Sequence, residues 1–178
     1  MRISKREFLR ALPIVAASLS AATPTFGHGK GDWNSLSARQ KSMKIVSAAL
    51  ATVGKKGGQC KAWVQDVVSA ASGRHVSVPL NSAVVTARWA ADTSGHVQDL
   101  GAAIRSAKPG DAVQMIIRDK YGKEIGHTAF IGSNDGTTIR WIESNYFGDE
   151  MVRADRDQTI AKFERAVVGG QYTVYRFT

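Results

Sequence analysis

The chain has 178 residues, of which 43% are hydrophobic, and this suits one folded domain with a single core better than two full domains. Its formal net charge is +9, but the basic residues form no long run of like charge, which argues against a dedicated nucleic-acid-binding protein. The single cysteine, Cys60, excludes an internal disulfide and a Cys-x-x-Cys zinc site.

Residues 1–27 have the charge order of an export signal: a basic start, an apolar stretch from Ala11 to Val15 and then small residues. The apolar stretch is too short to cross a bilayer, so no stable membrane span is expected. The motif "SKREFLR" is similar to a twin-arginine signal with Lys5 in place of the first arginine; an ordinary secretory signal is the alternative. We therefore expect one domain over residues 28–178, located in the periplasm, outside the cell or at the cell wall.

Removal of residues 1–27 takes away four basic side chains and one acidic side chain, which lowers the net charge from +9 to +6. The remaining excess favours an anionic environment such as cell-wall polymer.

Apolar spacing predicts two helices in the first part of this domain. The first runs from Asn34 to Gly54, with Asn34 or Ser35 as its N-cap, and its expected apolar face is made of Leu36, Met43, Val46, Leu50 and Val53. The second begins at Cys60 after two glycines, and we expect it to bury one face, made of Cys60, Trp63, Val64, Val67, Val68 and Ala71. Further along, "AVVTARWAA" is compatible with a short helix and "DTSGHVQDLG" with a loop.

The C-terminal half predicts an antiparallel sheet. After a turn at 108–111, strands are expected over 112–117, 127–131 and 138–146, with a hairpin turn at 134–136. A helix over 158–166 and a last strand, "QYTVYRF", follow. Helices first and an antiparallel meander afterwards indicate the α+β class, with N-terminal helices packed on the sheet.

Strand alternation places three polar residues on apolar faces: His127 with Ala129, and Glu143 and Asn145 with Trp141. Because the two strands are antiparallel neighbours, we expect these polar residues at one edge of the sheet. If the Cys60 helix packs on that face, the cysteine meets the histidine.

Cys60 is the candidate nucleophile, since a helix N-terminus and a nearby imidazolium both lower a thiol pKa. His127 is the candidate general base, and Glu143 or Asn145 would orient its ring. Backbone N–H groups at the helix start, with Gln59 as a further donor, can hold an oxyanion. No metal or organic cofactor is needed.

Each residue also has a structural interpretation. A cysteine on an apolar helix face is by default core packing, and a histidine in a strand is more often structural than catalytic. The buried carboxylate of Glu143 is harder to explain without a partner. His28, His75 and His96 receive the structural interpretation, as do Trp63, Trp89 and Trp141, although Trp141 can also wall a cleft.

Five segments, "GGQCKAW", "ARWAADTSG", "KPGDAVQM", "GHTAF" and "WIESNY", resemble in content and order those of CHAP domains, the cysteine- and histidine-dependent amidohydrolases/peptidases related to NlpC-type cell-wall peptidases. The resemblance covers Gly57 to Tyr146, about half of the chain. It implies a papain-like α+β fold, cleavage of amide bonds in peptidoglycan peptides, and Cys60, His127, Glu143 and Asn145 in the catalytic positions. The pair Lys61–Ala62 departs from the usual family pattern, which leaves subsite preference open.

The sequence thus predicts an exported, monomeric cysteine amidase or endopeptidase that acts on peptidoglycan peptides. The alternatives are a non-catalytic protein that binds wall peptides, a basic module that binds anionic polymer, and an enzyme that transfers the acyl group to an amine instead of water. Which amide bond is cut, and whether the wall is the producer's own or a competitor's, stay open.

Overall fold

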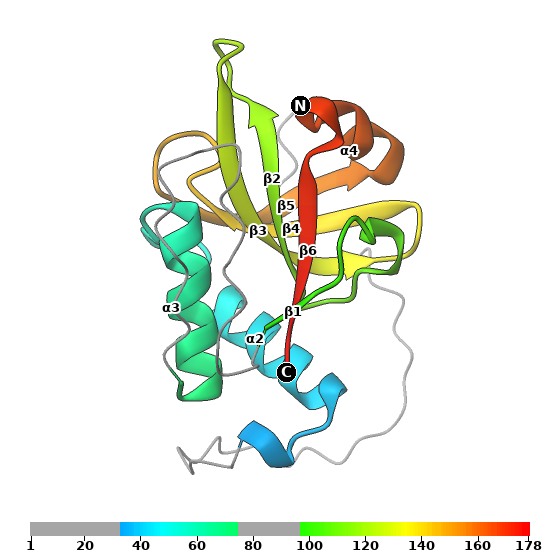
Figure 1. Cartoon of the computed structure of the whole chain (residues 1–178). Helices are drawn as coiled ribbons and strands as arrows, with labels where there is room; N and C mark the ends of the chain where they lie inside the picture. The colour runs from blue at the N-terminus through cyan, green and yellow to red at the C-terminus, as the bar shows by residue number, and fades with distance from the viewer. Residues whose placement is uncertain (1–32, 75–96) are drawn as a thin grey trace, which may run out of the picture.

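A computed structural model describes residues 33–74 and 97–178 and shows an α+β domain, as expected (Figure 1). The helices in this part of the chain are α2 (Ala38–Leu50), α3 (Cys60–Ser72) and α4 (Ile160–Ala166). The strands are β1 (Val97–Asp99), β2 (Ala112–Arg118), β3 (Glu124–Asn134), β4 (Thr138–Ser144), β5 (Val152–Thr159) and β6 (Tyr172–Phe177). Short 3-10 turns η1 (Trp33–Ser35), η2 (Ile104–Ser106) and η3 (Val168–Gly170) complete it. The "AVVTARWAA" segment lies outside the described residues.

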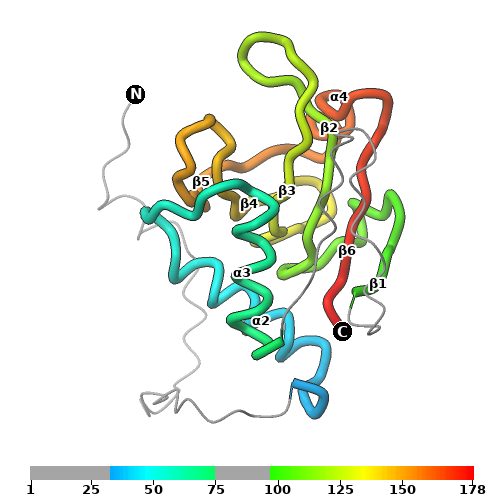
Figure 2. The backbone as a smooth tube through the Cα atoms, turned by 60° about the vertical axis from the view of Figure 1, so that its left-hand side comes forward, coloured from blue at the N-terminus to red at the C-terminus, as the bar shows by residue number. Residues whose placement is uncertain are grey.

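The six strands form one sheet in the order β1-β6-β2-β3-β4-β5, and all the strand pairs are antiparallel. The expected meander is present as β2, β3 and β4. The last strand, β6, lies between β1 and β2, so the C-terminal segment of the chain forms an interior strand of the sheet (Figure 2). β3 is thereby a central strand, held on both sides, which gives its side chains a rigid support.

Two hydrophobic cores lie on the two faces of this sheet. Helices α2 and α3 cover one face together, while α4 lies on the other side (Figures 1 and 2). The first core joins α2 and α3 to residues such as Phe130 and Ile142. The second core joins α4 and η2 to residues such as Ala129, Ile131 and Trp141. Neighbouring residues of one strand therefore point into different cores, as pleating requires.

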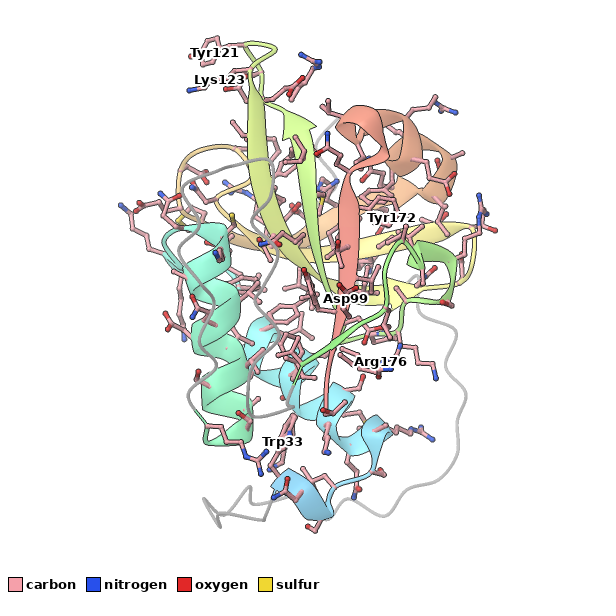
Figure 3. All side chains as sticks on the ribbon, in the orientation of Figure 1. Trp33, Asp99, Tyr121, Lys123, Tyr172 and Arg176 are labelled. Atoms are coloured by element: carbon pink, nitrogen blue, oxygen red, sulfur yellow. The ribbon has the colours of Figure 1, made fainter. Side chains whose placement is uncertain are left out.

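The tip of the β2–β3 hairpin and the first described turn lie at opposite ends of the domain (Figure 3). Tyr121 and Lys123 stand at the tip of the β2–β3 hairpin, and Trp33 lies at the opposite end (Figure 3). The indole nitrogen of Trp33 donates a 3.0 Å hydrogen bond to the carbonyl of Thr178. This bond connects the first described turn to the end of the chain.

The expected first helix is shorter than the sequence indicated, and its N-cap is different. Ser37 caps α2 in a capping box with Gln40, whereas Asn34 and Ser35 lie in the preceding 3-10 turn. The buried positions are Ile45 and Ala49, while Met43, Leu50 and Val53 of the expected apolar face are exposed. Ile45 and Ala49 lie in the core that α2 shares with α3, so packing against α3 determines which side of α2 is buried.

The second helix matches the prediction. It begins at Cys60, and Trp63, Val64, Val67 and Val68 are buried. It ends at Gly73, which adopts a left-handed conformation with φ 70°.

Two strands were not expected. β1 lies inside the segment interpreted as a loop, and three residues are too few for periodicity to reveal a strand; it forms by pairing with β6. β5 carries the polar sequence "VRADRDQT" and pairs with β4 alone. Because it is an edge strand, it needs few apolar side chains. The expected strand over 138–146 ends at Ser144, since Asn145 has φ 61°.

Candidate active site

The segment before Cys60 is attached to the β4–β5 region by backbone hydrogen bonds. Gly57 N–H donates to the carbonyl of Glu150 at 2.8 Å, and Gly54 N–H donates to that of Val152 at 3.0 Å. The Ser144 hydroxyl donates to the carbonyl of Gly58 at 2.8 Å. These contacts define where α3 begins, and hence where Cys60 lies.

Gly57 is required by close packing rather than by its backbone angles. A Cβ atom at this position would lie 2.6 Å from Val152 Cγ2, 2.7 Å from Ser144 Oγ and 2.7 Å from Trp63 Cδ1. Only glycine allows this close approach of the turn to the sheet.

Trp63 holds α3 against the sheet. Its ring packs edge-on against Phe130 of β3 with centroids 5.4 Å apart, and its indole nitrogen donates to Thr52 Oγ1 at 3.1 Å. The first turn of the helix is thereby anchored next to β3, the strand that carries His127.

His127 and Glu143 form a buried pair. His127 Nε2 lies 2.9 Å from Glu143 Oε2, and the two side chains are 3% and 2% exposed. His127 lies on β3 opposite Met115 of β2. Glu143 lies on the adjacent strand β4, opposite Ala129 of β3. The carboxylate takes one ring nitrogen of the imidazole and leaves the other for Cys60.

The Cys60 thiol is half-buried and hydrogen-bonded to the His127 ring. Burial raises its pKa, but the hydrogen bond and the charge of His127 outweigh burial, together with backbone hydrogen bonds from Thr128 and Lys61, so that the net pKa is lowered. Burial lowers the pKa of His127, whereas its bonds to Cys60 and Glu143 raise that pKa to about 9. Both shifts favour the thiolate–imidazolium pair over the neutral thiol–imidazole pair.

The expected packing face was wrong, although the expected meeting of the residues is found. Helix α3 packs on the face of Phe130 and Ile142, whereas His127 and Glu143 share the opposite face with Ala129. The contact is made by the first residue of the helix, which lies at β3 and bonds both the His127 ring and the Thr128 backbone. An end-on approach of a helix to a strand cannot be read from the period of either element.

Among the described residues, the side chain of Asn145 is hydrogen-bonded to partners other than His127. Its Nδ2 donates to Gln59 Oε1 at 3.1 Å, and its Oδ1 accepts from the Glu150 amide at 2.9 Å. Of the two candidates for orienting His127, the geometry therefore brings only Glu143 to the ring. Gln59 is the N-cap residue of α3, but its side chain makes no capping bond. Its amide oxygen instead accepts the hydrogen bond from Asn145.

Arg156 of β5 is a charged residue at the site that the sequence analysis did not identify. Its Nη2 donates to Glu143 Oε2 at 2.7 Å and its Nε donates to Glu143 Oε1. Its guanidinium lies 4.1 Å from the Tyr146 ring centroid and 5.2 Å from that of Trp141. The segment "VRADRDQT" has no apolar pattern from which a strand could be predicted. The sequence therefore does not show which of Arg153 and Arg156 reaches Glu143.

Trp141 is fully buried beneath Arg156 and packs on Phe163, so it does not wall an open cleft. Tyr146 lies edge-on to the His127 ring at 5.4 Å. Tyr146 and Arg156 also line a cavity of about 450 Å³ on this side of the sheet, together with Met115, Ile117, Gln158 and Phe163. His28, His75, His96 and Trp89 lie outside the described residues.

Among the described residues, no group of three His, Cys, Asp or Glu side chains is arranged to hold a metal ion. No helix in the same ranges has the length and apolarity to span a membrane.

Comparison with solved structures shows that the fold is shared with Ly7917. One match is the crystal structure of Ly7917 with the hydrolyzing product of MDP, with a TM-score of 0.56 and 12% identity over 76% of this chain. The crystal structure of Ly7917 matches with a TM-score of 0.52 and 17% identity over 75% of this chain. The matches span 62% and 61% of those chains. No protein-family model and no curated protein matches the sequence.

Proposed function

We propose that this chain is a cysteine hydrolase that cleaves amide bonds in peptidoglycan peptides. The observation that carries the proposal is the series of contacts Cys60–His127–Glu143, with the thiol at a helix N-terminus and its pKa lowered. A purely structural cysteine gains nothing from a lowered pKa, because a thiolate is more readily oxidised than a neutral thiol.

The substrate class is supported by fold and by resemblance. One of the two Ly7917 structures was solved with the hydrolyzing product of MDP, muramyl dipeptide, which is a peptidoglycan fragment, so a protein of this fold binds a ligand of that class. The CHAP-like segments around Cys60, His127 and Glu143 support the same substrate. An amidase and an endopeptidase both agree with this support.

In the proposed mechanism, the Cys60 thiolate attacks the carbonyl carbon of the scissile amide, and the carbonyl oxygen becomes an oxyanion. The His127 imidazolium gives its proton to the nitrogen, the C–N bond breaks and an amine leaves. A water molecule then gives a proton to His127 and attacks the thioester, and the C–S bond breaks to release the carboxylic acid. Glu143 keeps the ring oriented and stabilises its charged form.

The oxyanion is assigned to donors at the start of α3. The backbone N–H of Cys60 is one of the free N–H groups of a helix N-terminus. Because the amide oxygen of Gln59 accepts a bond from Asn145, its NH₂ group is left as a donor. In this assignment Asn145 acts through Gln59.

The test compares wild type with Cys60→Ala on purified peptidoglycan, with released fragments identified by mass spectrometry. We expect new amine and carboxylic acid ends from the wild type and none from the variant, with both proteins showing the same circular dichroism. Full release by Cys60→Ala contradicts the proposal.

We also propose that residues 1–27 direct export and are then removed, which places the enzyme where peptidoglycan lies. Mass spectrometry of the protein recovered from outside the cytoplasm tests this, because the mature N-terminus is expected shortly before His28. An intact Met1 in the exported protein contradicts cleavage.

A further inference from the structure

We propose that Arg156 is a positioning residue that holds Glu143 as a carboxylate against His127, and thereby keeps the Cys60–His127 ion pair formed in mildly acidic conditions. This inference rests on the proposed function and adds to it a residue outside the Cys60, His127, Glu143 and Asn145 set.

Both oxygens of Glu143 accept from Arg156, while Oε2 also faces His127 Nε2 at 2.9 Å. A planar guanidinium that binds both carboxylate oxygens sets the plane of the carboxylate as well as its charge. The orientation of the His127 ring is thus determined from β5 through β4.

Arg156 is itself held in place. Its Nη1 donates to Gln158 Oε1 at 2.8 Å, and the same oxygen accepts from the Trp141 indole at 3.0 Å. Aromatic rings of Trp141 and Tyr146 lie against the guanidinium. The side chain of Arg156 is 19% exposed, in contrast to the pairs Arg140–Asp157 and Arg118–Glu124, which are exposed.

Arg156 also affects the charge of Glu143. Burial raises the pKa of Glu143, and the hydrogen bonds from Arg156 and His127 reverse this and lower it. Without Arg156, a buried carboxylate beside His127 takes up a proton at higher pH. A neutral Glu143 no longer stabilises the imidazolium, and the thiolate is lost with it.

Other charged groups near this set do not replace Arg156. Arg153 is the register partner of Glu143 and contributes to the local charge, but its guanidinium binds Asp149 and lies over Phe147. Lys61, beside the thiol, has a pKa lowered by burial, which exceeds the opposite effect of Cys60. Arg153 therefore offers a matched control on the same strand.

The test measures alkylation of the single cysteine by iodoacetamide as a function of pH, from about pH 4 to about pH 9, by mass spectrometry of the intact protein. In Arg156→Gln we expect the acid inflection to move up by about one pH unit, which corresponds to about a tenfold slower reaction below it. Arg153→Gln should keep the wild-type inflection. An unchanged inflection in folded Arg156→Gln overturns the proposal.

A double variant tests whether Arg156 acts through Glu143. When Glu143→Gln is already present, adding Arg156→Gln should move the inflection no further. A full additional shift would show that Arg156 acts directly on the thiol and would overturn the positioning role.

If Arg156→Gln does not fold, Arg156→Lys decides, because an ammonium cannot bind both oxygens in one plane. We expect a smaller shift in the same direction, and no shift overturns the proposal. Alkylation needs no substrate, so the two failures are distinguishable: a failure to cleave peptidoglycan contradicts the proposed function, whereas an unchanged inflection contradicts the role of Arg156.

Discussion

His127 Nε2 lies 2.9 Å from Glu143 Oε2, with both side chains buried between β3 and β4. This contact commits one ring nitrogen to the carboxylate, so the other nitrogen serves Cys60. The relationship distinguishes Glu143 from Asn145, which the sequence left as equal candidates.

Glu143→Gln should lower kcat/KM for peptide release by about a hundredfold, since an amide neither stabilises the imidazolium nor selects its tautomer as a carboxylate does. Steady-state kinetics on a defined muropeptide measure this. Glu124→Gln, which removes an exposed carboxylate of β3 paired with Arg118, is the control and should retain wild-type activity. A Glu143→Gln enzyme as active as this control would remove Glu143 from the mechanism.

The stability contributed by Glu143 should depend on pH. Burial raises the pKa of Glu143 in the folded protein, but bonds from Arg156 and His127 lower it below the ordinary carboxyl value. Its contribution is therefore complete above the unfolded pKa and is lost as pH falls through the depressed folded pKa. We expect Glu143→Gln to be less stable than wild type by about 3 kcal/mol near neutral pH.

Urea denaturation at about pH 7 and about pH 4 measures this difference, which should narrow on acidification. A gap that stays constant over this range would mean that the carboxylate charge does not stabilise the fold.

Asn145→Gly should reduce kcat by about tenfold, with a smaller effect on KM, because Gln59 loses the bond that orients its amide toward the oxyanion. Glycine is the suitable replacement, since residue 145 has φ 61° and alanine would add backbone strain. Asn145→Gly and Gln59→Ala should show a similar decrease in kcat. Normal kcat in Asn145→Gly would separate Asn145 from oxyanion stabilisation.

Gly57→Ala should destabilise the protein by about 1–3 kcal/mol, because the new methyl group overlaps Val152, Ser144 and Trp63. It should also lower activity, as relief of the overlap moves the start of α3. Gly54→Ala provides the comparison: nothing lies within 4 Å of its Cβ, and only the φ of 81° resists the substitution. Equal unfolding midpoints and activities for the two variants would show that the packing at Gly57 is not limiting.

Much of the fold followed from local patterns. The period of α3 predicted both its start at Cys60 and its buried face, and the turn at 134–136 predicted the β3–β4 hairpin. The apolar face of α2 and the edge strand β5 were missed. In both cases the deciding contacts come from distant segments, and an edge strand can be polar without cost.

By itself, the sequence determined which residues have the chemistry: one thiol after two glycines, one strand histidine and a carboxylate on an apolar strand face. The tertiary structure decided how they meet. Helix α3 approaches β3 with its end, Asn145 turns to Gln59, and Arg156 reaches Glu143 from a strand that carries no apolar pattern. The physical reason is that periodicity encodes which face of an element is buried, whereas contacts between element ends and between edge residues depend on the packing of the whole chain.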